Sequence, residues 1–148
     1  TSPGHQLWAV RTDGRGDVTE THVEWIVKRK VPNKVSPLLL GTDLYMVTDE
    51  GVATCLDTRS GKARWDRRLE GNFSASPLAT PTHLYFFGED GRTTVFDPAN
   101  PDRPVAENRL PGRVVATPAV AGETLLVRTE THLWAIRRGA PRVEAEGK

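Results

Sequence analysis

The sequence of 148 residues predicts an all-β protein, and three observations carry that prediction. Its apolar segments are short and rich in β-branched and aromatic residues, as strands are. The 13 glycines and 11 prolines interrupt the chain so often that no window of about 11 residues keeps a helical stripe. The sequence also repeats itself with a period of about forty residues, which indicates one small structural unit used several times.

The repeat is visible in a dipeptide that opens each copy. Ser36–Pro37 returns as Ser76–Pro77, 40 residues later, and as Thr117–Pro118, 41 residues after that. An apolar pair follows each dipeptide at the same distance: Leu44–Tyr45, Leu84–Tyr85 and Leu125–Leu126. Two such coincidences in register predict three copies of one unit along the chain.

The first copy divides into four short strands. We expect them over residues 38–40, 44–48, 52–56 and 63–66, because each stretch is apolar or β-branched and ends at a turn signal. Asp49–Gly51 predicts a hairpin whose glycine takes a positive φ. Asp57–Gly61 predicts a tight loop, in which the aspartate bonds its own downstream backbone. Proline opens the first strand, where a missing N–H costs least.

The chain also holds the end of an earlier copy. Leu7–Val10 matches Leu133–Ile136 almost letter for letter, and Trp25 precedes Ser36 by 11 residues as Trp65 precedes Ser76. Val23–Val27 therefore reads as a fourth strand. The predicted units are the end of a preceding copy (1–35), two full copies (36–75 and 76–116), an incomplete copy (117–138) and a disordered tail (139–148).

A four-stranded unit repeated every ~40 residues predicts the blade of a β-propeller. One small twisted sheet buries little surface alone, whereas blades stacked face to face around an axis bury both faces. A sandwich is the alternative for many short strands, but it requires no strict period. About 3.3 blades are present, and propellers close with about four to eight.

An incomplete ring leaves several arrangements open. The N-terminal fourth strand could complete the last copy within one chain or between two chains. The chain could instead be a fragment of a larger propeller, or a subunit that pairs with a separate protein. Because an unpaired strand edge invites pairing, we expect a protein partner or self-association to complete the propeller, and a monomer is the least favoured state.

The first copy resembles a known repeat family. Its order of Ser-Pro, apolar run, Leu-Tyr, acidic-Gly turn, strand ending in Asp, Thr-x-x-Gly-Lys and Trp is similar to the pyrroloquinoline-quinone (PQQ)-like, BamB-like propeller repeat, and specifically to the C-terminal blades of such proteins. The second copy departs from it, with Val105 or Ala106 in place of Trp65 and the loop Pro98–Pro104 in place of Thr-x-x-Gly-Lys. The resemblance implies scaffold roles for six residues: Trp25 and Trp65 between blades, Gly51 and Gly91 in hairpins, and Asp57 and Asp97 in the following turns.

The resemblance also implies a function. It favours a non-catalytic propeller module that acts as a scaffold for protein–protein interaction or assembly, in a periplasmic or otherwise extracytoplasmic compartment. The alternative is a fragment of a PQQ-dependent oxidoreductase whose cofactor site lies on other blades. We expect neither catalysis nor a cofactor, because the acidic pairs Asp49–Glu50 and Glu89–Asp90 each precede a turn glycine and read as hydrated hairpin tips.

Composition narrows the function further. The 20 basic and 19 acidic side chains are evenly spread, which argues against nucleic acid as a partner. The single cysteine, Cys55, excludes an internal disulfide, and the four histidines are too far apart to predict a metal site. The longest apolar runs fall far short of a membrane span. One basic set could form an anion- or peptide-binding rim: Lys28, Arg29, Lys30, Lys34, Arg64, Arg67 and Arg68.

Overall fold

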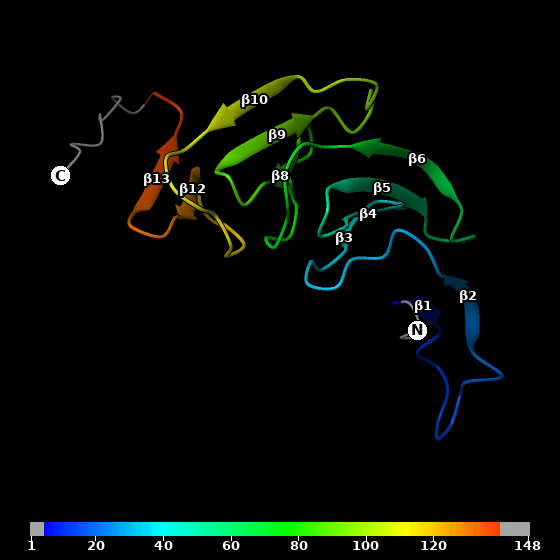
Figure 1. Ribbon diagram of the computed structural model, residues 1–148. Helices are drawn as coiled ribbons and strands as arrows, with labels where there is room; N and C mark the ends of the chain where they lie inside the picture. The colour runs from blue at the N-terminus through cyan, green and yellow to red at the C-terminus, as the bar shows by residue number, and fades with distance from the viewer. Residues whose placement is uncertain (1–4, 140–148) are drawn as a thin grey trace.

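A computed structural model describes residues 5–139 and contains thirteen strands and no helix in that range (Figure 1). No helix in this part of the chain is therefore long and apolar enough to cross a membrane. The strands are β1 (Leu7–Val10), β2 (Val23–Val27), β3 (Leu38–Leu40), β4 (Asp43–Val47), β5 (Val52–Asp57), β6 (Ala63–Arg68), β7 (Leu78–Ala79), β8 (Leu84–Phe87), β9 (Arg92–Phe96), β10 (Ala106–Arg109), β11 (Ala119–Ala121), β12 (Thr124–Arg128) and β13 (Leu133–Arg137).

The strands form four antiparallel sheets, each a simple meander. Strands β3 to β6 and strands β7 to β10 make two four-stranded sheets, β11 to β13 make a three-stranded sheet, and β1 pairs with β2. The register repeats with the sequence, since Leu44 lies opposite Leu56, Leu84 opposite Phe96 and Leu125 opposite Ile136. The all-β prediction and the four-stranded unit are thus confirmed. Strand β6 runs through Arg68, two residues further than predicted.

The sheets follow one another along an open arc, with β1 and β13 toward opposite ends of it (Figure 1). Strand β2 pairs with β1, and β13 pairs with β12, so the first and last sheets stay separate within residues 5–139. Closure of a ring within one chain is therefore not the arrangement found. Residues 140–148, most of the predicted tail, lie outside the described part.

The core lies between the sheets, as stacked blades require. One cluster joins the first two four-stranded sheets and includes the buried side chains of Tyr45, Val47 and Phe86. A smaller cluster, with Phe87 and Val127 at its centre, joins the second four-stranded sheet to the three-stranded one. Each sheet therefore depends on its neighbours for burial, because a meander of four short strands cannot cover its own faces.

Candidate functional site

Trp65 lies at the interface between the two four-stranded sheets. Its ring centroid is 6.0 Å from that of Tyr45 in its own sheet and 6.2 Å from that of Phe96 in the next. The position follows from strand alternation, which turns Trp65 and Arg67 of β6 toward the next sheet and Arg64 and Arg68 away from it. The tryptophan that the family resemblance assigned to blade packing thus lies between blades.

Trp25 joins the N-terminal sheet to the following sheet by a different contact. Its indole Nε1 donates a hydrogen bond of 2.9 Å to the carbonyl oxygen of Thr58. The ring lies flat against Gly61, where a Cβ atom would come within 2.6 Å of it. Gly61 itself has φ = +66°, as the predicted tight loop requires. Trp25 therefore packs against the β5–β6 loop, at the outer edge of the next blade.

Gly51 and Gly91 occupy equivalent hairpins with φ values of +93° and +83°. Each carbonyl oxygen accepts a hydrogen bond from the residue that follows the fourth strand, Leu69 N at 2.8 Å and Leu110 N at 3.0 Å. Little space remains beside either glycine, since an added Cβ would lie 2.6 Å from the Leu69 oxygen and 2.2 Å from the Leu110 oxygen. The hairpin thereby anchors the exit of each four-stranded sheet.

Asp57 and Asp97 hold the turns after β5 and β9. The Asp57 carboxylate accepts hydrogen bonds from the Ser60 hydroxyl at 2.8 Å and the Ser60 amide at 2.9 Å, which lowers the pKa of Asp57. The Asp97 carboxylate accepts one from the Ala99 amide at 2.8 Å. Both side chains act on their own turns, so they contribute to the scaffold rather than to an exposed site.

The predicted basic rim is divided by the structure. Four of its members make ion pairs with carboxylates: Lys30 with Asp66, Lys34 with Asp49 (3.7 Å), Arg64 with Asp43 (2.7 Å) and with Asp57, and Arg67 with Asp102 (3.2 Å). Arg67 also lies on the opposite face of β6 from Arg64 and Arg68. Lys28, Arg29 and Arg68 have no ion pair within residues 5–139. The seven side chains therefore do not form one continuous anion-binding surface.

A network of side chains that the sequence did not predict ties neighbouring blades together. Glu89 accepts hydrogen bonds from the hydroxyl of Ser74 and from Arg113, whose Nε lies 3.1 Å away. The Ser-Pro dipeptides are linked in series as well. The amide of Ser36 donates to the Ser76 hydroxyl at 3.0 Å, and the amide of Ser76 donates to the Thr117 hydroxyl at 2.9 Å.

Because this network contains the Glu89 carboxylate, we expect the free energy of unfolding to decrease as the pH falls. The hydrogen bond from Ser74, followed by that from Arg113, lowers the pKa of Glu89 below its ordinary value. A depressed carboxylate pKa stabilises the fold above the unfolded-state value of about 4.3, and this contribution is lost as the pH falls through the folded-state pKa. Urea unfolding at pH 7 and below pH 4 measures it. Glu89→Gln should reduce the loss of stability in acid, and an unchanged pH dependence would contradict the assignment.

The candidate nucleophilic and metal-ligating side chains lie apart from one another. Cys55 is buried, and burial raises the pKa of its thiol to about 11, so it is a poor nucleophile at neutral pH. Three histidines, His22, His83 and His132, each bond through Nδ1 to the hydroxyl of the preceding threonine. Within residues 5–139 no three His, Cys, Asp or Glu side chains gather as metal ligands do.

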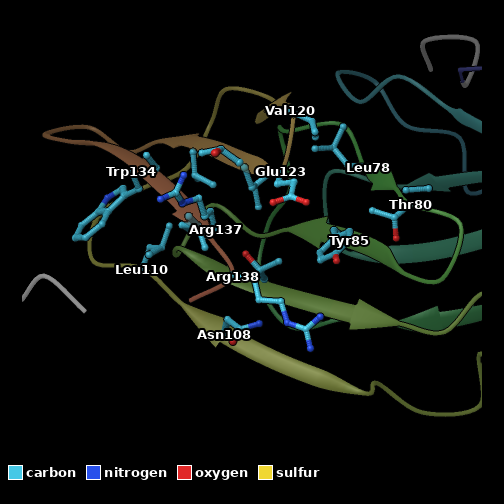
Figure 2. Close-up of a pocket in the computed structure, with 18 of the residues that line it drawn as sticks. Leu78, Thr80, Tyr85, Asn108, Leu110, Val120, Glu123, Trp134, Arg137 and Arg138 are labelled. Atoms are coloured by element: carbon cyan, nitrogen blue, oxygen red, sulfur yellow. The ribbon is translucent and has the colours of Figure 1, made fainter. Parts of the chain in front are cut away.

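A groove of about 750 Å³ lies between the second four-stranded sheet and the three-stranded sheet (Figure 2). Its walls are mainly apolar and include Leu78, Tyr85, Leu125 and Trp134. Its volume falls within the range of roughly 300–1,000 Å³ typical of ligand sites. We name it the interblade groove and take it as the candidate site.

Two replacements in the repeat distinguish this interface from the preceding one. Ala106 pairs with Val95 as Trp65 pairs with Cys55, so alanine stands where the preceding blade has its interface tryptophan. Across the groove, Ile136 stands where the preceding interface has Phe96. Phe96 is 1% exposed and Ile136 is 42% exposed. Two large rings pack together in the first interface, whereas the second has smaller side chains at the equivalent positions, of which Ile136 lines the groove.

Strand β13 forms an open edge next to the groove. The two complete sheets carry a fourth strand, β6 or β10, on the outer side of the third. No strand of residues 5–139 occupies that place beside β13. Leu133 at the start of β13 is 70% exposed. Within residues 5–139 the three-stranded sheet therefore ends at β13.

Comparison with known proteins gives one family and several solved structures that share the fold. The family described as outer membrane protein assembly factor BamB matches residues 2–103. The crystal structure of BamB from Moraxella catarrhalis superposes with a TM-score of 0.67 at 21% identity, covering 84% of this chain and 41% of that one. No curated protein sequence matches the chain significantly.

Other solved structures share the fold at lower identity. Quinohemoprotein alcohol dehydrogenase from Comamonas testosteroni has a TM-score of 0.54 at 17% identity, over 64% of this chain and 16% of that one. Glutaminyl cyclase from Myxococcus xanthus has a TM-score of 0.54 at 13% identity, over 78% and 52%. The chain thus spans about two fifths of the BamB structure, about one sixth of the dehydrogenase and about half of the cyclase. At these identities the likeness establishes the propeller fold and no shared chemistry.

Proposed function

The chain belongs to the family of the outer membrane protein assembly factor BamB, and from this premise we propose that it is a non-catalytic propeller module that acts as a scaffold for protein–protein interaction or assembly. Its place of action is extracytoplasmic, by analogy with the outer-membrane assembly role in the family's description. The unclosed arc of blades is the observation that carries the proposal.

Both ends of the arc support an interaction role. The N-terminal sheet exposes the side chains of Trp8, Val10 and Ile26 on one face, and each is more than a third exposed. The C-terminal sheet ends in the open edge of β13. Exposed apolar faces and unpaired edges are costly in isolation and are stabilised when another chain covers them. A second copy, or a separate protein that contributes strands, would complete the propeller.

Light scattering on the purified chain, at rising concentration, tests this proposal. We expect an assembly heavier than the 16.3 kDa of one chain. Deletion of residues 1–30, which removes β1 and β2, should change the number of chains in that assembly. A monomeric mass at every concentration, with unfolding that is unaffected by the deletion, would contradict completion by self-association.

A second candidate follows from the likeness to quinohemoprotein alcohol dehydrogenase. In this alternative the chain is part of a PQQ-dependent oxidoreductase, and the cofactor residues lie on other blades. Absorbance titration with PQQ and Ca²⁺ separates the two. Saturable binding in the micromolar range would favour the oxidoreductase, whereas the scaffold proposal predicts no saturable change.

A further inference from the structure

The segment between β6 and β7 contains a tripeptide that fits a pattern for covalent modification. Asn72–Phe73–Ser74 matches the acceptor pattern for N-linked glycans, which is an asparagine, any residue but proline, and then serine or threonine. The other asparagines, Asn33, Asn100 and Asn108, are followed two positions later by valine, aspartate and leucine. The pattern therefore selects Asn72 among the four asparagines of the sequence.

The backbone around Asn72 is held in place while its side chain stays exposed. The Asn72 carbonyl oxygen accepts a hydrogen bond of 2.7 Å from the amide of Glu89, and the Phe73 amide donates one of 2.9 Å to the carbonyl oxygen of Asp49. These two partners lie in the hairpins of neighbouring sheets. The Asn72 side chain is exposed and makes no hydrogen bond to another residue of the range 5–139. A bulky group on its carboxamide would therefore extend into solvent without breaking a contact of the fold.

Folding has the opposite effect on the other two residues of the tripeptide. Phe73 is 1% exposed and belongs to the core cluster between the two four-stranded sheets. The Ser74 hydroxyl is half-buried and donates a hydrogen bond to Glu89. Because the acceptor pattern requires this hydroxyl, an enzyme that reads the pattern must reach it. The hydroxyl is accessible in the unfolded chain and engaged in the folded one.

We propose that Asn72 is an acceptor site for an N-linked glycan and that the glycan is added before this part of the chain folds. The co-substrate is an oligosaccharide carried on a polyprenyl pyrophosphate. The carboxamide nitrogen of Asn72 attacks C1 of the first sugar, and a bond forms between these two atoms. The bond from C1 to the phosphate oxygen breaks, the nitrogen gives up one of its two protons, and the lipid pyrophosphate leaves.

This inference goes beyond the scaffold function. It shares with that proposal only the extracytoplasmic compartment, since this acceptor pattern is used in secreted proteins. Once the chain has folded, the bond from Ser74 to Glu89 closes the recognition element, and the modified Asn72 remains on the surface.

Cell-free translation with endoplasmic-reticulum microsomes tests the acceptor site. The full chain is placed behind a cleavable signal sequence, so that it enters the microsomes before it folds. We expect one added glycan, seen as a heavier band that endoglycosidase H returns to the size of the unmodified chain. Asn72→Gln should lose the glycan completely, and Ser74→Thr should keep it, because threonine also satisfies the pattern. Asn108→Gln makes the matched change at another exposed asparagine and should be modified like the parent.

A second measurement tests the order of folding and modification. The purified, folded chain is incubated with solubilised oligosaccharyltransferase and a lipid-linked oligosaccharide, beside its own tryptic digest after the protease is inhibited. Trypsin cleaves after Arg68 and Arg92 and so releases the tripeptide within one unfolded peptide. Because the folded chain must first open locally, we expect the peptide to be modified at least about ten times faster.

The acceptor site is refuted if the parent chain gains no glycan in the microsomes, or if Asn72→Gln is modified as the parent is. Equal rates for the folded chain and its digest would overturn the proposed order of events. Light scattering measures self-association independently, so an assembly without any glycan would refute this inference while leaving the scaffold function standing.

Discussion

Gly91→Ala is expected to destabilise the protein by more than about 3 kcal/mol, enough to unfold part of the population at room temperature. The residue has φ = +83°, a left-handed conformation that costs an alanine roughly 1–2 kcal/mol. The added Cβ would also lie 2.2 Å from the carbonyl oxygen of Leu110 and 2.8 Å from that of Gly112. These are backbone atoms, so no side-chain rotation relieves the clash.

The clash also removes a contact that the fold uses. To make room, the chain after β10 must move away, and the hydrogen bond from the Leu110 amide to the Gly91 oxygen is then lost. The same segment leads through Arg113, which bonds to Glu89. The exit of one blade and the entry to the next are therefore disturbed together. The shift of the urea unfolding midpoint measures the effect.

Gly122→Ala provides the matched control. Gly122 also has a left-handed backbone, with φ = +58°, but nothing lies within 4 Å of the place its Cβ would take. The substitution should cost only the conformational term of roughly 1–2 kcal/mol. Equal losses for Gly91→Ala and Gly122→Ala would show that the close approach of Leu110 contributes nothing.

The sequence predicted the strands well because each was bounded by chemistry that acts locally. Asp57 and Gly61 form a tight turn through contacts among neighbouring residues alone. Gly51 supplies the positive φ that its hairpin requires. The forty-residue repeat then grouped the four predicted strands into one blade. Repetition of that blade predicted a propeller.

Contacts between blades were harder to predict because they join residues far apart in the sequence, 24 positions for Glu89 and Arg113 and 36 for Lys30 and Asp66. The ion pairs of Glu89 with Arg113 and of Lys30 with Asp66 depend on how neighbouring sheets stack. The basic set looked like one rim in the sequence, but the alternation of β6 sends Arg67 to the opposite face from Arg64. The acidic partners could be identified only after the sheets were placed.

The interblade groove was predictable from the sequence only in part. The absence of a tryptophan at Val105–Ala106 was visible in the sequence as a departure from the repeat. Its consequence was not, because a missing ring can be compensated by movement of the neighbouring sheet or by a larger residue opposite. Here Ile136, which lines the groove, is smaller than its counterpart Phe96.

Trp65→Ala is expected to cost about 3 kcal/mol, toward the lower end of the range for removal of a packed tryptophan, because the ring is only half-buried. The lost contacts are with Tyr45 in the same sheet and with Phe96 in the next. Removal of the ring would give the first blade interface the alanine that the second interface already has. Loosened packing there should appear as a loss of near-ultraviolet circular dichroism alongside the lower unfolding midpoint.

Trp8→Ala separates packing between blades from the general loss of an aromatic residue. Trp8 also lies on a strand, but it is 43% exposed, and its indole Nε1 bonds only to the nearby side chain of Gln6 at 3.0 Å. Since Trp8 buries less apolar surface than Trp65 and packs against no neighbouring ring, the substitution should cost less than Trp65→Ala. If Trp8→Ala and Trp65→Ala proved equally destabilising, the contact of Trp65 with Phe96 could not be what holds the two four-stranded sheets together. A much larger loss for Trp65→Ala would instead assign the stability of this arc to the interfaces between its blades.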